Sequence, residues 1–142
     1  MTTFSVNYII KVTKTAKKQG RKLNLSDQAL NWLINQVKLL KFWPENSAEF
    51  DCEKVGEAYE FKFDHVEDKW IRVFIYQDNI RKILWVIKVM AKKQNSLTQA
   101  DHISLQTAIS QMKQDLNEYK RLQLKEIKSN SLIAIKGGKD EK

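Results

Sequence analysis

Apolar and charged residues alternate along a stretch in the middle of the chain. In the segment 59–64 (YEFKFD), aromatic residues occupy the odd positions and charged residues the even positions. A period of two predicts a half-buried strand. Two further strand patterns follow at 70–77 and 81–90, after short polar turns. Three consecutive strands with short connections predict an antiparallel meander.

The segments on either side complete an α+β pattern. The segment 81–90 is apolar on both faces and is therefore expected at the centre of the sheet. A further strand is expected at 6–12 (VNYIIKV), which is β-branched, aromatic and too short for a helix. A basic polar segment follows to about Lys22. A helix is then expected to start at the N-cap Ser26 and to end before Pro44.

A long C-terminal helix is expected after the meander. Thr98 and Asp101 fit a capping pattern, and apolar residues recur from there at helical spacing to about Ile127. The sequence thus predicts one domain over 1–127 and a flexible tail over 128–142. The predicted fold is α+β: a small antiparallel sheet, made of the N-terminal strand and the meander, with an N-terminal helix and a long C-terminal helix.

Several classes of protein are excluded by composition. A chain of 142 residues fits one domain. Cys52 is the single cysteine, and no signal peptide is visible, so we expect a cytoplasmic protein without disulfides. The longest apolar run, 83–87, is far too short to span a membrane. Two histidines and one cysteine offer no metal-ligand spacing, and no metal or other cofactor is expected.

Charge supplies the first indication of function. The net charge is +8, and it is unevenly distributed. Residues 1–24 hold six basic residues and no acid, 45–68 hold nine acids, and 69–93 hold seven bases against Asp78 alone. Basic surfaces attract polyanions because lysine and arginine release the counterions of phosphates. A soluble protein with scattered surface lysines remains the alternative interpretation.

Three short patterns occur in a fixed order along the predicted strands. The first is 59-YEFKF-63, with Lys62 as its basic residue, and the second is 71-IRVFIY-76, with Arg72. The third, 87-IKVMAKKQNSLTQADHI-103, consists of an apolar strand, the pair Lys92–Lys93, a polar turn and the start of a helix. Together with the order of elements, these patterns resemble the RelE/ParE superfamily of toxins from bacterial type II toxin–antitoxin systems, and most closely its HigB-like, phage-derived branch.

The resemblance covers roughly residues 4–116 and departs from the family pattern at several positions. Lys62 stands where arginine is usual, and Gln99 stands where proline is usual in the first turn of the helix. The residues 87–88 replace a common leucine–histidine pair. These departures affect the expected chemistry more than the expected fold.

The resemblance implies a ribosome-dependent endoribonuclease that cleaves mRNA without a metal and inhibits translation. In such a reaction the RNA 2′-hydroxyl attacks the adjacent phosphate. A base must accept the hydroxyl proton, and cations must stabilise the phosphorane and the leaving 5′-oxygen. Lysine and arginine would supply these functions, since a lysine among other cations has a lowered pKa and arginine binds phosphate in a bidentate manner.

Candidate site residues follow from that requirement, and each has a structural alternative. Arg72 is the expected phosphate clamp, unless it pairs with Glu60 or Asp64 across the sheet. Lys62 and Lys92 are the other catalytic candidates, but both could be solvated lysines at a strand surface or end. The residues expected to bind RNA or phosphate are Lys93, Lys88, Arg81 and Tyr76. Tyr76 could instead belong to the core, and His65 and His102 are expected at the surface.

The implied partners are a cognate antitoxin, of helix-turn-helix type, and the ribosome with its mRNA. Two other functions fit the same sequence. One is a ParE-like toxin that binds a topoisomerase and needs no catalytic cations, and the other is an inactive basic nucleic-acid-binding phage accessory protein. Convergence of Arg72, Lys62 and Lys92 on one face would favour the nuclease, whereas cations spread around the sheet would favour the binding functions.

Overall fold

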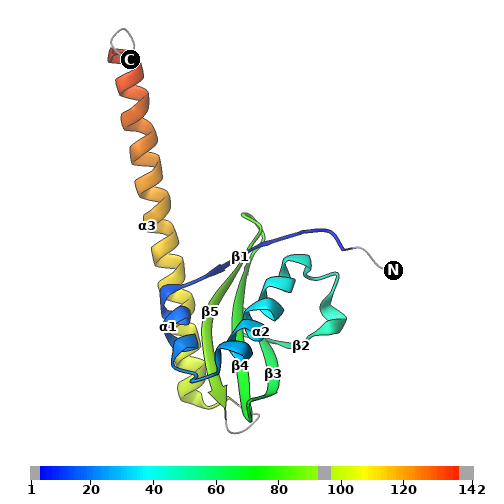
Figure 1. The fold of residues 1–142 in the computed structure, drawn as a ribbon. Helices are drawn as coiled ribbons and strands as arrows, with labels where there is room; N and C mark the ends of the chain where they lie inside the picture. Colours follow the sequence, from blue (N-terminus) through cyan, green and yellow to red (C-terminus); the bar gives the residue numbers. More distant parts are fainter. Residues whose placement is uncertain (1–3, 93–96, 138–142) are drawn as a thin grey trace. The chain divides into compact units, whose positions relative to one another are not determined.

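The computed structural model describes residues 4–92 and 97–137, and it divides the chain into two compact units, 1–109 and 110–142. The first unit contains a five-stranded sheet with the strand order β1-β5-β4-β3-β2 (Figure 1). Its strands are β1 (Ile9–Val12), β2 (Asp51–Val55), β3 (Ala58–Val66), β4 (Lys69–Asp78) and β5 (Ile83–Lys92). The predicted α+β class is therefore confirmed.

The predicted meander is formed by β3, β4 and β5, which pair antiparallel in chain order. Two features of the sheet differ from the expectation. β1 pairs parallel to β5, with Ile9 opposite Ile83, so the sheet is mixed rather than wholly antiparallel. The short polar strand β2, which lacks an alternating apolar pattern, adds antiparallel to the outer edge of β3.

Two helices from the N-terminal part of the chain pack on one face of the sheet. α2 (Asp27–Lys38) begins where predicted, because the side chain of Ser26 accepts a hydrogen bond from the Ala29 N–H at 3.1 Å. Two 3₁₀ turns, η1 (Leu39–Phe42) and η2 (Ser47–Glu49), lead from α2 to β2. The basic polar segment after β1 contains a helix that was not predicted, α1 (Lys14–Arg21), which is capped by Thr13.

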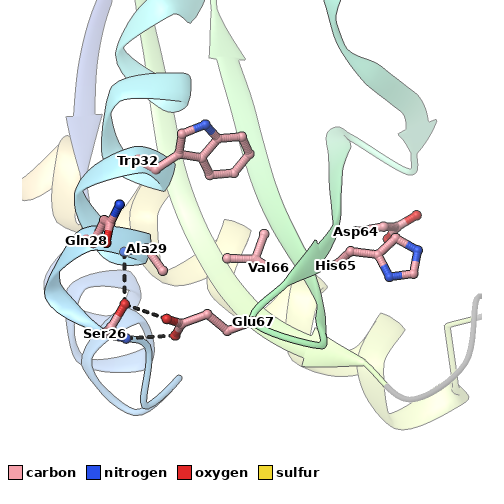
Figure 2. Close-up of a pocket in the computed structure, with 8 residues that line it drawn as sticks. All are labelled: Ser26, Gln28, Ala29, Trp32, Asp64, His65, Val66 and Glu67. Carbon is pink, nitrogen blue, oxygen red and sulfur yellow. Dashed lines mark hydrogen bonds between the residues drawn. The ribbon is translucent and has the colours of Figure 1, made fainter.

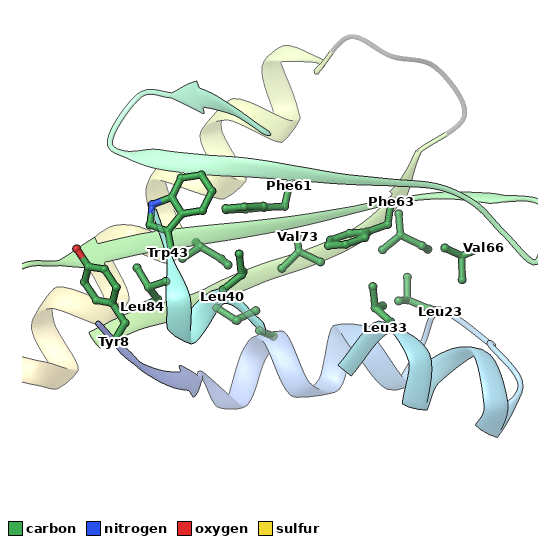
Figure 3. Close-up of a cluster of buried hydrophobic side chains, with 14 residues drawn as sticks. Tyr8, Leu23, Leu33, Leu40, Trp43, Phe61, Phe63, Val66, Val73 and Leu84 are labelled. Carbon is green, nitrogen blue, oxygen red and sulfur yellow. The ribbon is translucent and has the colours of Figure 1, made fainter. Parts of the chain in front are cut away.

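The main core lies between the sheet and the helices α1 and α2 (Figure 3). Phe61 and Phe63 of β3 and Val73 of β4 point toward these helices, as the period of two predicts. The helices contribute Ala16 and Leu33 to this core. The opposite face of the sheet is consequently left for the even-numbered residues of β3 and β4, which include the predicted site.

α3 (Gln99–Gly137) is the long C-terminal helix, and its predicted capping pattern is confirmed. The Thr98 N–H donates to Asp101 Oδ2 at 2.9 Å, and the Asp101 N–H donates to Thr98 Oγ1 at 3.1 Å. The helix continues past the predicted end near Ile127, while the flexibility of 128–142 stays a prediction. Within the described part of the chain, no helix combines the length and the apolar character needed to cross a membrane.

Candidate functional site: a cationic face on the central strands

The predicted cations of the central strands lie on one face of the sheet. Lys62 is directly opposite Arg72, and Arg72 is directly opposite Met90. Lys88 and Lys92 lie two residues before and after Met90 on the same strand, and therefore on the same side. Arg72 thus has Lys62 on one neighbouring strand and two lysines on the other. Directly opposed side chains are about 5 Å apart at Cβ, and the next row is about 7 Å away.

Arg72 is completely buried, with 0% of its surface exposed. Its Nη1 donates to Asp64 Oδ1 at 2.7 Å and to the Ile71 carbonyl oxygen at 3.1 Å. Its Nε lies 3.3 Å from Oε2 of the buried Glu60, close enough for an ion pair but without hydrogen-bond geometry. Both carboxylates named in the structural alternative therefore contact this arginine. In this conformation the guanidinium binds protein carboxylates rather than an open surface.

Lys62 is the most accessible cation of this face within the meander, with 20% of its side chain exposed. Its Nζ lies 2.6 Å from Oε1 of Glu53, which comes from the unpredicted strand β2. The hydrogen bond to Glu53 raises the pKa of Lys62 above its ordinary value. A raised pKa suits a cation that holds phosphate, and it disfavours Lys62 as a general base.

Lys88 has the opposite electrostatic environment. Only 7% of its surface is exposed, and its Nζ donates to the hydroxyl of Ser104 in the second turn of α3 at 2.8 Å. Burial lowers the pKa of Lys88, although the charge of Asp101 acts in the other direction. Lowering the pKa of a lysine makes its neutral form more available for accepting a proton. Lys88, predicted only as a phosphate contact, is therefore the better candidate for the base.

Lys92 is held by the first turn of α3. Its Nζ lies 2.9 Å from Asp101 Oδ2, the same oxygen that caps the helix through the Thr98 N–H. Burial tends to raise the pKa of Asp101, but the hydrogen bonds from Thr98 and Lys92 outweigh it and lower the pKa to about 2. The start of α3 thus covers the two lysines of β5 and supplies one of them with a counter-charge.

Of three other predicted residues, two lie elsewhere in the fold and one lies outside the residues that the structure describes. Arg81 lies in the β4–β5 turn and pairs with Asp78 at 2.7 Å. It is seven residues from Lys88, or roughly 23 Å along an extended strand. Tyr76 is half-buried on β4, opposite Ala58 and Trp85, toward that same end of the sheet. Lys93 lies outside the described residues, so its predicted role in phosphate binding stays a prediction.

A separate concave region lies between the start of α2 and the β3–β4 hairpin (Figure 2). It has a volume of about 400 Å³. Trp32 stands on one side and Asp64 and His65 on the other, while Glu67 accepts hydrogen bonds from the backbone and hydroxyl of Ser26. None of the cations described above lines this pocket. It therefore does not offer a phosphate site of the expected kind.

Sequence reasoning missed the groups that hold the cations of the sheet. Glu53 and Ser104 were not expected to reach Lys62 and Lys88, because β2 was not predicted and Ser104 is distant in sequence from its partner. The acids at even positions of β3, Glu60 and Asp64, did predict that Arg72 would be paired. Lysines on α1 were visible as a charge run, but their helical arrangement was not predicted.

Comparisons with known proteins yield structural matches only. The chain matches no known family description and no curated protein sequence. It is similar to a toxin–antitoxin complex, RelBE2, from Mycobacterium tuberculosis, with 14% identity over 63% of this chain and 95% of the other, and a TM-score of 0.48. It is also similar to a mutant E. coli toxin RelE in the free state, with 17% identity over 69% and 96%, and a TM-score of 0.49.

A third similar structure is the archaeal RelE–RelB complex from Pyrococcus horikoshii, with 17% identity over 63% of this chain and 99% of the other. Its TM-score is 0.46. All three TM-scores lie below 0.5, so these likenesses carry no conclusion about what this chain does.

Proposed function

We propose that this protein is a cytoplasmic toxin of the RelE type, from the HigB-like branch, that inhibits translation by cleaving mRNA on the ribosome. The observation that carries the proposal is the shared face of Lys62, Arg72, Lys88 and Lys92 on three adjacent strands. Four cations within two rows of one another supply the positive field that a phosphorane needs. The sequence patterns that resemble this family fall on the same strands.

The environments of these cations suggest different roles. Lys88 has a lowered pKa and would accept the proton of the 2′-hydroxyl. Lys62 and Lys92 would hold the non-bridging oxygens of the phosphate as charged groups. Arg72, at the centre of the face, would stabilise the developing charge once a phosphate replaces Asp64 as its partner. Each role uses a group already aimed at the same side of the sheet.

Access to this face requires rearrangement at the start of α3. Lys88 and Lys92 are bonded to Ser104 and Asp101, and a bound phosphate would have to take the place of these partners. An anionic substrate competes directly with a carboxylate for an ammonium group, because both accept the same charged hydrogen bonds. We propose that RNA bound on the ribosome displaces Asp101, and that a cognate helix-turn-helix antitoxin prevents this displacement.

A second function is favoured by the burial of Arg72. A guanidinium with no exposed surface and two carboxylate partners is typical of a structural ion pair. A ParE-like toxin that binds a topoisomerase, or an inactive nucleic-acid-binding phage accessory protein, needs no free arginine there. Measurements of mRNA cleavage and of DNA topology in cells distinguish these alternatives from the nuclease.

Lys88→Met tests the nuclease while keeping the fold. Methionine fills the space of the buried lysine without its charge, so we expect normal thermal unfolding. In a purified translation system with programmed ribosomes, the parent protein should cleave mRNA, and Lys88→Met should slow cleavage by about 100-fold or more. The matched control is Lys54→Met, at an exposed position of β2, which should cleave like the parent.

Inducible expression in bacteria separates the alternatives. Arrest of growth with cleaved mRNA, relieved by Lys88→Met, supports the nuclease. Arrest that Lys88→Met leaves unchanged, with intact mRNA and altered DNA supercoiling, contradicts it and supports a topoisomerase-binding toxin. Normal growth with intact mRNA at full expression contradicts both toxins and supports the accessory protein.

A further inference from the structure

We infer that α1 forms a second basic surface, separate from the sheet, that binds the phosphate backbone of structured RNA. Its charged residues share one side of the helix and are all exposed, and we name this side the α1 basic face. They are Lys14, Lys17, Lys18 and Arg21, together with Lys22, the C-cap residue that follows the helix. The inference does not depend on the proposed cleavage, because it concerns binding alone.

The orientation of the α1 basic face is set by contacts on the other side of the helix. Ala16 is 1% exposed and belongs to the main core. Gln19 Oε1 accepts a hydrogen bond from the Val89 N–H of β5 at 2.8 Å. At 3.6 residues per turn, the five cations occupy an arc of roughly 140° on the side opposite these two anchors. The helix cannot rotate its charges away without losing both anchors.

The cations of α1 differ in their partners from the four cations of the sheet and its turns that form ion pairs. In the sheet and its turns, Lys62, Arg72, Arg81 and Lys92 each contact a carboxylate. Among the described residues, no carboxylate pairs with any cation of the α1 basic face. No acid occurs in the sequence before Asp27. These charges are therefore fully available to an external anion.

The arrangement works against the stability of the helix itself. Lys14–Lys18, Lys17–Arg21 and Lys18–Lys22 are like-charge pairs at the i,i+4 spacing, which destabilises an isolated helix. Lys14 also lies in the first turn, where the helix dipole disfavours a cation. A charge pattern that costs folding stability, and that no internal acid offsets, is explained by an external polyanion that reverses the cost on binding.

RNA fits this surface better than an anionic membrane does. A helix that lies in a membrane interface needs an apolar face to insert among the lipids. The one apolar residue of α1 is Ala16, and it is buried against the sheet. The exposed surface of the helix is therefore wholly polar and cationic. Binding through phosphate contacts of this kind depends on charge rather than on base sequence.

The test uses the full chain and a 2′-O-methyl RNA hairpin, which lacks the attacking hydroxyl and so cannot be cleaved by the proposed reaction. Binding is measured by fluorescence anisotropy at several salt concentrations. Each phosphate contact contributes about 0.7–0.9 to the slope of log K against log salt. The triple variant Lys14→Gln/Lys18→Gln/Arg21→Gln should reduce the magnitude of that slope by about 2. It should also weaken binding at least about tenfold at 0.1 M salt.

Two matched variants isolate the surface from net charge. Lys38→Gln/Lys41→Gln/Lys54→Gln removes the same three charges from exposed positions outside α1 and should leave the slope within about 0.5 of the parent. Lys14→Arg/Lys18→Arg/Arg21→Lys keeps the charges and should bind like the parent. Because glutamine and lysine have similar helix propensities, the variant Lys14→Gln/Lys18→Gln/Arg21→Gln should also unfold at the same or a higher temperature than the parent.

Two results would overturn the inference. The first is equal weakening of RNA binding by the two glutamine triples, which would assign binding to net charge. The second is unchanged RNA binding by the α1 triple. If that triple also loses binding to phosphatidylserine vesicles, α1 is assigned to a lipid surface instead. A protein that binds the hairpin through α1 but never cleaves mRNA would refute the proposed nuclease and leave this inference intact.

Discussion

The ammonium group of Lys92, the last residue of β5, lies 2.9 Å from a carboxylate oxygen of Asp101 in the first turn of α3. The same oxygen accepts the Thr98 N–H. One atom therefore caps a helix and neutralises a buried lysine that belongs to the sheet. The start of α3 and the cationic face are coupled through this side chain, and the coupling can be measured.

Asp101→Asn should lower the free energy of unfolding by about 1–2 kcal/mol, because Lys92 loses its ion pair with Asp101 and the helix loses a charged cap. Urea unfolding followed by circular dichroism measures the change. Asp115→Asn, at an exposed position of the same helix, is the control and should stay within about 0.5 kcal/mol of the parent. Equal stability of Asp101→Asn and the parent would contradict the coupling.

The contribution of Asp101 should also depend on pH. Its pKa is lowered from 3.8 to about 2 in the folded state, so the folded protein binds a proton less readily than the unfolded chain does. The stabilisation is therefore fully present above the unfolded pKa and is lost as the pH falls through about 2. The difference in unfolding free energy between the parent and Asp101→Asn should shrink between about pH 5 and pH 2.5. A constant difference would contradict this assignment.

Arg72→Ala should destabilise the fold by about 3–5 kcal/mol, because the buried Glu60 would lose the guanidinium that lies 3.3 Å from it. Thermal or urea unfolding measures this loss directly. The double variant Arg72→Met/Glu60→Leu removes both charges, keeps the volume and should recover most of the stability. If Arg72→Ala proves as stable as the parent, the ion pair has no structural role. Under the proposed function, loss of toxicity in Arg72→Ala alone would report on folding as well as on chemistry.

Glu53→Gln should increase mRNA cleavage, under the proposed function, by about two- to tenfold, because phosphate would no longer compete with a carboxylate for Lys62. In the ion pair between Lys62 and Glu53, the side chain of Glu53 is exposed. The free energy of unfolding should therefore change by no more than about 0.5 kcal/mol. Cleavage by programmed ribosomes is the measurement, and Glu49→Gln, at another exposed acid, is the control. Reduced cleavage by Glu53→Gln would mean that Glu53 assists the reaction rather than competing with it.

The parts of the fold that the sequence predicted correctly are those governed by local rules. Alternation placed β3 and β4, and hydrogen-bonding side chains marked the starts of α2 and α3 at Ser26 and Thr98. α1 was missed because its single buried apolar side chain, Ala16, leaves no stripe to detect. β2 was missed because an edge strand that packs on few neighbours needs little apolar sequence.

The site was only partly predictable for a similar reason. Strand alternation correctly grouped Lys62 with Arg72, and the register of β5 placed Lys88 and Lys92 beside them. The state of each cation depends on partners that no local pattern reveals. Ser104 reaches Lys88 only because the second turn of α3 lies beside β5, and Glu53 reaches Lys62 only because β2 joins the sheet.

The hydrogen bond between Gln19 and the Val89 N–H has a consequence for how this protein behaves in a crowded cell. β5 is ten residues long, but β1 pairs with only its first four residues. The remaining edge would expose unpaired backbone groups on the most apolar strand of the sheet, which is the template on which another chain can add a strand and start an aggregate. α1 packs beside that edge, and the side chain of Gln19 accepts a hydrogen bond from one of its backbone N–H groups, that of Val89. Unravelling of α1 would thus lead to self-association before it led to global unfolding.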